Sequence, residues 1–161
     1  MVFKIATLPG DGVGREIIEE GVKVLRAAQE IVTGFDLEFE WYDAGAELYR
    51  KTGEALPPSV YQACQDSNAI YLGAIGLPDV KETTGTEVGG RVMFGLRFGL
   101  DLFAGVRPIK LFEGVRSPLR DKERIDFVIL RENIEGLFAS YGGGTLVSDE
   151  VATDTMVITR K

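Results

Sequence analysis

The chain has 161 residues, of which 45% are apolar, 27% charged and 9% aromatic, as in soluble globular proteins and unlike disordered tails. A net charge of -7 disfavours nucleic acid as a partner, because a phosphate backbone would be repelled. No apolar run reaches the roughly 18 residues of a membrane helix or resembles a secretory signal, so we expect a cytoplasmic protein without a membrane partner. The single cysteine, Cys64, excludes an internal disulfide, and the absence of histidine leaves oxygen ligands for any metal.

The first half of the chain alternates between strand and helix patterns. Glycine loops over residues 9–14 and 73–76 each follow an apolar run. The order of elements predicts a doubly wound α/β sheet, in which ligands bind beyond the carboxyl ends of the strands, where both loops lie. The predicted elements are a strand over residues 3–8, a helix over 15–30, a strand over 37–41, a helix over 57–67 and a strand over 69–72.

The second half begins with a polar segment rich in glycine and threonine, residues 77–89, which we predict to be a mobile surface loop. The last residues, 145–160, end without a closing element, so we expect the chain to be the front part of a longer protein. The predicted elements are a helix over residues 90–101, strands over 102–106 and 127–130, a flexible joint at 142–144 and an extended arm over 145–160.

Three arginines occupy unusual places. An unpaired buried guanidinium costs several kcal/mol, so Arg97 requires an anion if it is buried within its apolar arc. Arg107 and Arg131 follow the two predicted strands directly, at carboxyl ends where ligands bind. Planar two-pronged donors suit carboxylates, so the trio predicts a small di- or tricarboxylate ligand. The arc around Arg97 on a helical wheel is formed by Met93, Phe94, Leu96, Phe98 and Leu100.

Structural explanations stay open beside the functional ones. Each arginine could pair with an internal acid such as Asp101 or Glu132. The loop Gly10-Asp-Gly-Val-Gly14 is not the dinucleotide fingerprint, because position 15 is arginine, and it serves either as a tight turn or as a ligand contact. Cys64 lies between apolar neighbours and is expected to fill the core.

Taken together, these motifs resemble the N-terminal portion of the isocitrate/3-isopropylmalate/tartrate dehydrogenase family, the metal-dependent β-decarboxylating dehydrogenases. The resemblance spans nearly the whole chain and implies an isopropylmalate dehydrogenase-like, non-Rossmann fold that binds NAD or NADP. It rests on the ordered set Leu8-Pro-Gly-Asp-Gly-Val-Gly14, Gly73-Ala-Ile-Gly76, Leu96-Arg97, Arg107-Pro108, Arg131-Glu-Asn133 and Asp154-Thr155.

The resemblance also implies that residues 1–101 belong to a large α/β domain and that residues 102–161 begin a small domain with a dimerisation arm. It further implies roles for individual residues. Arg97, Arg107 and Arg131 match the family's substrate-carboxylate arginines. The cofactor segment falls on about residues 76–90, in which we assign cofactor contacts to Gly76, Leu77, Pro78 and Glu87.

The implied reaction is oxidation of a 2-hydroxy acid by nicotinamide, followed by loss of the β-carboxylate. Mg²⁺ or Mn²⁺ polarises the reacting oxygen in this family. The family's lysine and metal-binding aspartates lie beyond position 161, so the resemblance implies no metal ligand in this chain and no turnover by the chain alone. Phe138 occupies the position of the family's tyrosine and has no proton to give, which makes Tyr141 a candidate substitute.

Substrate choice depends on the residues ahead of Arg97. Isocitrate is disfavoured, because Arg91 and Met93 stand where isocitrate enzymes carry serine and asparagine. Met93 and Phe94 offer an apolar wall, as in isopropylmalate enzymes, while Arg91 could turn outward or meet an extra polar group of a tartrate-like substrate. We therefore predict a 3-isopropylmalate-like or tartrate-like acid.

Two functional classes remain. The first is a homodimeric dehydrogenase that acts on a small carboxylate. The alternative is a non-catalytic carboxylate- or nucleotide-binding module derived from this family, for which Phe138 is the argument.

Overall fold

The computed structural model describes residues 1–83, 85–119, 124–140, 145–146 and 151–160. The chain divides into two units, Met1–Leu96 and Arg97–Lys161. The predicted boundary after residue 101 and the assignment of large and small domains stay predictions. The helices are α1 (Val13–Ile31), α2 (Ala46–Thr52), α3 (Pro58–Asp66), α4 (Gly89–Gly99) and the short 3-10 helix η1 (Leu137–Ser140). The strands are β1 (Val2–Leu8), β2 (Asp36–Trp41), β3 (Ala69–Leu72), β4 (Ala104–Lys110), β5 (Asp126–Glu132), β6 (Thr145–Leu146) and β7 (Ala152–Thr153).

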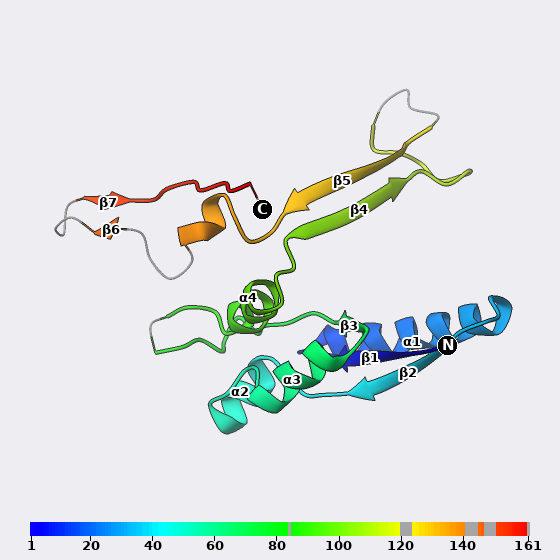
Figure 1. Ribbon diagram of the computed structural model, residues 1–161, viewed down its shortest axis with the longest axis horizontal. Coiled ribbons are helices and arrows are strands. Elements are labelled where there is room, and N and C mark those ends of the chain that lie inside the picture. Colours follow the sequence, from blue (N-terminus) through cyan, green and yellow to red (C-terminus); the bar gives the residue numbers. More distant parts are fainter. Residues whose placement is uncertain (84, 120–123, 141–144, 147–150, 161) are drawn as a thin grey trace. The chain divides into compact units, whose positions relative to one another are not determined.

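The first unit is built on a parallel sheet in the order β2-β1-β3 (Figure 1). Ile5 on the central strand pairs with Phe39 on one side and with Ala69 on the other. The crossover from β1 to β2 and the crossover from β2 past β1 to β3 run in opposite directions along the sheet. Since such crossovers are right-handed, α1 and α3 cover opposite faces. This arrangement confirms the predicted α/β fold and puts the change of strand order at the carboxyl ends of β1 and β3.

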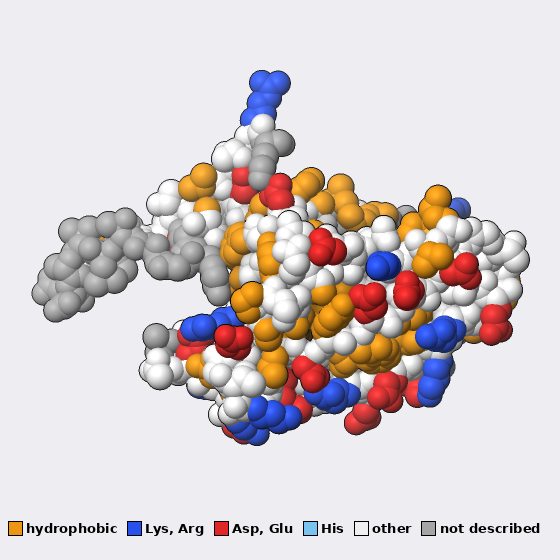
Figure 2. All heavy atoms as spheres, turned by 60° about the horizontal axis from the view of Figure 1, so that its bottom comes forward, with side chains coloured by type: hydrophobic (Ala, Val, Ile, Leu, Met, Phe, Trp, Pro, Cys, Tyr) orange, Lys and Arg blue, Asp and Glu red, His pale blue; other side chains and the backbone are white. Residues whose placement is uncertain are grey.

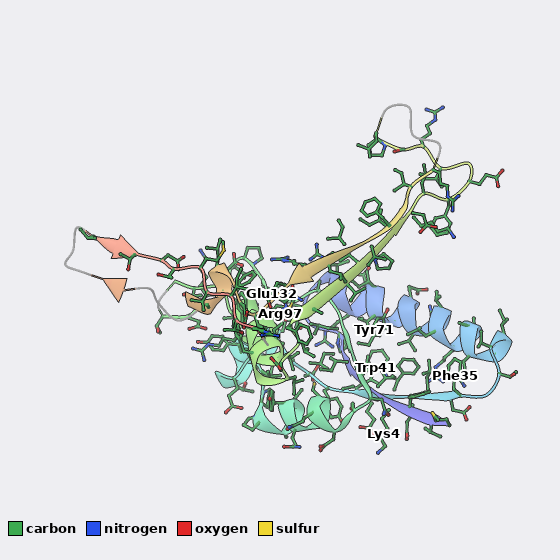
Figure 3. The ribbon with its side chains drawn as sticks, turned by 45° about the horizontal axis from the view of Figure 1, so that its top comes forward. Lys4, Phe35, Trp41, Tyr71, Arg97 and Glu132 are labelled. Atoms are coloured by element: carbon green, nitrogen blue, oxygen red, sulfur yellow. The ribbon has the colours of Figure 1, made fainter. Side chains whose placement is uncertain are left out.

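The core of the first unit forms around the central strand. Ala6, Thr7 and Leu8 are fully buried, as expected for a strand flanked on both sides and covered on both faces. Tyr71 lies on β3 and points toward α1 (Figure 3), where a side chain at Gly21 would collide with its hydroxyl group. The other buried apolar residues of this unit are Ile18, Val22, Ala44, Ala46, Ala55, Val60, Cys64, Val80, Val88, Val92 and Leu96.

Glycines let the two loops approach each other closely at the carboxyl edge of the sheet. A Cβ atom on Gly14 would lie 2.7 Å from the carbonyl oxygen of Ala74 and nearer still to that of Pro9. Gly10 has a φ of 76°, and a Cβ there would also meet the Ala74 carbonyl. The loop sequence is therefore required for backbone packing, which is the first of the two explanations that the sequence left open.

We expect Gly14→Ala to destabilise the protein by about 2–3 kcal/mol, because the new methyl group meets backbone atoms that cannot rotate away. Gly95→Ala is the matched control, since Gly95 also lies inside a helix and its Cβ would meet only the side chain of Leu56, at 3.3 Å. That control is expected to fall within about 1 kcal/mol of the wild type. Urea titration measures both values, and equal stabilities of the two variants would contradict the packing argument.

In the second unit β4 and β5 form an antiparallel ribbon (Figure 1). The prediction that the strands end at residues 106 and 130 was wrong, so Arg107 and Arg131 lie within strands and not directly after them. The amide of Leu111 donates to Ile125 and that of Asn133 to Phe103, so by alternation Pro108 falls at a non-hydrogen-bonded pair. Proline therefore costs β4 no bond to β5, and pairing continues past it.

The end of the chain also differs from its prediction. Instead of one extended arm over residues 145–160, β6 and β7 pair with each other in antiparallel fashion. Further on, Val157 and Gly136 exchange two backbone hydrogen bonds. The predicted joint at residues 142–144 lies outside the described residues.

Apolar side chains also reach the surface, where they lie among charged ones (Figure 2). Within the part of the chain that the structure describes, no helix has the length and apolar character needed to cross a bilayer.

Candidate functional site

The loops at the carboxyl edge of the first unit's sheet are joined by the carboxylate of Asp11, which is 2% exposed. Oδ2 accepts hydrogen bonds from the amides of Ala46 at 2.8 Å and Gly76 at 2.7 Å, and Oδ1 accepts from the amide of Glu47 at 2.8 Å. The amide of Asp11 in turn donates to the carbonyl of Ala74. Asp11 therefore joins the loop after β1, the start of α2 and the loop after β3.

The segment that follows Gly76 is anchored at several points, contrary to its prediction as a mobile surface loop. Val80 and Val88 are buried in the core, and Lys81 pairs with Glu87 in an antiparallel bridge. Arg50 of α2 also donates to Asp79 at 2.7 Å. The segment was predicted to be a mobile loop because most of its residues are polar. Its two buried valines are nevertheless enough to dock it on the core.

The four residues predicted to contact a cofactor all lie on this segment. Gly76 and Leu77 are half-buried, whereas Pro78 and Glu87 are exposed. The Leu77 side chain lies 3.8 Å from the position of a Cβ on Gly12, so the loop after β1 and the segment meet. Apolar surface beside an exposed carboxylate fits a nucleoside, whose ring needs a flat contact and whose ribose hydroxyls need an acceptor.

Arg91, on the first turn of α4, holds the same segment through Glu82. Its Nε donates to one carboxylate oxygen, and its Nη2 donates to the other at 2.7 Å. The hydrogen bond from Arg91 holds the pKa of Glu82 below its usual value of 4.5; desolvation opposes this shift, and the charge of Arg91 adds to it. The sequence left Arg91 either to turn outward or to meet a polar group of the substrate, and the structure instead shows it engaged by Glu82.

We expect Glu82→Gln to change the acid dependence of stability. A carboxyl whose pKa is lower in the folded state stabilises the protein above its unfolded pKa and loses that contribution as the pH falls through the folded pKa. The wild type should therefore lose more stability than the variant as the pH falls below about 4.5. Thermal unfolding between neutral pH and pH 3 measures this difference. Parallel curves for the two proteins would contradict the assignment.

Arg97 lies near the end of α4 and is half-buried. The expectation that it sits inside the buried arc was wrong. The buried stripe is formed by Val88, Val92 and Leu96, spaced four residues apart, which places Arg97 at its flank. Met93 is half-buried on the same helix, and Phe98 is exposed. Because Arg97 is partly exposed, the cost of burying an unpaired cation does not by itself require a bound anion.

Arg107 and Arg131 lie on one face of the β4–β5 ribbon. Arg107 is opposite Ile129 and Arg131 is opposite Gly105, so the two arginines are diagonal neighbours. Such neighbours are about 7–8 Å apart, within the reach of long side chains. Gly105 leaves the position opposite Arg131 free of a side chain. The ribbon can therefore direct two guanidinium groups toward one ligand.

Arg131 contacts another residue singled out from the sequence. Its guanidinium carbon lies 5.5 Å from the ring centroid of Phe138, a cation–π contact. Among the described residues no ion pair involves Arg97, Arg107 or Arg131. The ion pairs with Asp101 or Glu132 that the sequence left open are therefore not formed in this part of the chain. No described hydrogen bond joins Arg97 to the other two, and the convergence of all three stays a prediction. Tyr141 lies outside the described residues.

The second unit also contains a cavity of about 240 Å³ that the sequence did not indicate. Asp101, Glu132 and Glu135 line it together with apolar side chains, so it repels a carboxylate ligand. The Glu132 carboxylate accepts from the amides of Ile134 and Glu135, and Glu135 accepts from Thr159. We therefore exclude this cavity as the site for an acidic substrate.

The described residues also bear on whether this part of the chain can bind a metal ion. Over the described ranges, no group of three acidic or cysteine side chains is arranged to hold a metal ion. The described residues alone therefore provide no complete site for the divalent ion that the family resemblance implies.

Comparison with known proteins agrees with these observations. The profile of the isocitrate/isopropylmalate dehydrogenase family matches residues 4–161. The 3-isopropylmalate dehydrogenase of Nocardia farcinica is 44% identical over 160 residues, and that of Bifidobacterium longum is 41% identical over 159 residues. In both cases the alignment covers 98% of this chain and 45% of the relative, so the chain spans about half the length of these relatives.

Solved structures give the same result. The crystal structure of isocitrate dehydrogenase from Methylococcus capsulatus matches with a TM-score of 0.73 and 28% identity, covering 98% of this chain and 43% of that one. The isopropylmalate dehydrogenase-like fold expected from the motifs is thereby confirmed. The chain therefore belongs to the isocitrate/isopropylmalate dehydrogenase family.

Proposed function

We propose that the full-length protein is an NAD(P)-dependent, Mg²⁺- or Mn²⁺-dependent dehydrogenase that oxidises and decarboxylates a malate-type 2-hydroxy acid. The observation that carries the proposal is the pair of arginines on one face of the β4–β5 ribbon, which have no acidic partner among the described residues. Two planar cations on a shared face match a substrate with carboxylates on neighbouring carbon atoms.

A 3-isopropylmalate-like substrate is favoured over a tartrate-like one. Arg91 is engaged by Glu82 and so is not free to bind an additional hydroxyl or carboxylate. Half-buried Met93, three residues before the end of the buried stripe at Leu96, supplies apolar surface for an alkyl group. The relatives in Nocardia farcinica and Bifidobacterium longum carry the name of that activity.

The chain's own residues supply binding and orientation in this proposal. Arg97, Arg107 and Arg131 hold the carboxylates, and Gly76, Leu77, Pro78 and Glu87 hold the dinucleotide. A dinucleotide held there would supply the acceptor for the hydride of the hydroxyl-bearing carbon. The described residues provide no group of three ligands for a metal ion.

Phe138 favours a second candidate function. The ring cannot donate a proton and instead lies against the guanidinium of Arg131. A protein that binds a carboxylate or a nucleotide without turnover would need Arg131 but no proton donor at position 138.

Assay of the full-length protein separates the two functions. We expect NADH or NADPH to form when 3-isopropylmalate is supplied with Mn²⁺ and either dinucleotide, together with one CO₂ per reduced cofactor. A panel with tartrate, malate and isocitrate ranks the substrates. Binding of these acids by calorimetry without any reduced cofactor would support the non-catalytic module and contradict the dehydrogenase.

Two further expectations belong to the proposal. We propose a homodimer, in which the second unit contributes to the interface, because exposed apolar residues such as Val106, Val128 and Leu130 line one face of the ribbon. A cytoplasmic location also remains proposed. Light scattering of the full-length protein tests the dimer, and a monomeric mass at micromolar concentration would contradict it.

A further inference from the structure

We propose that Asp11 is a positioning residue for the cofactor, acting through the amide of Gly76. This inference rests on the proposed function, because the segment that begins at Gly76 is the one assigned to the dinucleotide. Asp11 itself is too buried to contact a ligand, being 2% exposed. Its effect must therefore pass through the backbone groups that it holds.

The hydrogen bonds of Asp11 fix the start of the cofactor segment. A carboxylate oxygen that accepts two amides, from Gly76 at 2.7 Å and Ala46 at 2.8 Å, ties the loop after β3 to the start of α2. Gly76 has a φ of 106°, so the chain changes direction at this residue. The direction in which Leu77 and Pro78 leave the sheet is thereby set by a bond made 65 residues away in sequence.

The surroundings of the carboxylate are built to accommodate it. Gly45 has a φ of 118°, and a Cβ at this position would lie 2.8 Å from Asp11 Cγ and closer to Oδ2. No described cation pairs with Asp11, so its charge is met by the three backbone amides. A neutral side chain of the same shape should keep part of this arrangement, because one amide oxygen can still accept from Gly76.

Steady-state kinetics of the full-length protein test the inference. We expect Asp11→Ala to raise the KM for the dinucleotide about tenfold, while the KM for the acid changes by less than about twofold. Asp11→Asn should give a smaller rise, since its carbonyl oxygen can replace Oδ2. It also keeps the test valid if Asp11→Ala does not fold. Asp43→Asn is the control, because Asp43 is an exposed acid of the same unit whose partner is Arg15.

Hydrogen exchange provides a readout that is independent of activity. The Gly76 amide should be protected in the wild type, less protected in Asp11→Asn and unprotected in Asp11→Ala. A lower apparent kcat with both KM values unchanged is the signature of a merely structural role and would overturn the inference. If the wild type binds no dinucleotide, the proposed function fails as well; if it binds and Asp11→Ala binds equally well, only the role of Asp11 is lost.

Discussion

Replacement of Arg131 by methionine is expected to lower kcat/KM for the acid substrate by roughly two to three orders of magnitude, or about 3–4 kcal/mol of transition-state binding. Methionine keeps an unbranched apolar stem beside Phe138 but cannot neutralise a carboxylate. The loss should appear chiefly in the KM for the acid, because the arginine binds substrate and transition state alike. Steady-state kinetics of the full-length protein at saturating dinucleotide measures the effect.

Arg116→Met is the matched control for this substitution. Arg116 is exposed in the connection between β4 and β5 and lies outside the ribbon pairing. The control should keep kcat/KM within about twofold of the wild type, since salt screens an exposed charge that does not contact the substrate. Similar losses in Arg131→Met and Arg116→Met would show that net charge, and not a local contact, governs substrate binding.

The second large effect is on stability. Asp11→Ala should lower the free energy of unfolding by about 3–6 kcal/mol, because three buried amides lose their acceptor at once. That loss is a large part of the roughly 5–15 kcal/mol that holds a protein folded. Urea titration followed by the fluorescence of Trp41, the single tryptophan of the sequence, measures it at the end of β2.

Asp43→Ala separates this effect from the loss of any acid. Asp43 has a 68% exposed side chain and pairs with Arg15 at 3.2 Å, so its removal should cost less than about 1 kcal/mol. A stability of Asp11→Ala within about 1 kcal/mol of the wild type would mean that water replaces the carboxylate and that Asp11 does not hold the three segments together.

The sequence pattern predicted those helices and strands whose residues show a clear apolar spacing. The strand over residues 69–72 coincides with β3, and the helix over residues 15–30 lies within α1, because apolar spacing reports burial directly. The helix α2 was not predicted. Its amides at Ala46 and Glu47 are capped by Asp11, which lies far away in sequence, and its seven residues carry no clear apolar period.

The family was predictable from the sequence, whereas the geometry of the candidate site was not. The arginines indicated a carboxylate ligand, the ordered motifs resembled the dehydrogenase family, and the family is confirmed. The placement of Arg107 inside β4 depends on pairing with β5, which no local pattern of β4 reveals. In the sequence Asp11 is only a residue between two glycines. Its role in joining three segments depends on hydrogen bonds to residues that are distant in sequence.

The most direct test of the arginine site is a crystal structure of the full-length protein with 3-isopropylmalate bound. We expect nitrogen atoms of Arg97, Arg107 and Arg131 to lie about 2.7–3.2 Å from carboxylate oxygens of one ligand molecule. A ligand bound elsewhere, or arginines that each turn to a neighbouring acid of the protein, would contradict the account.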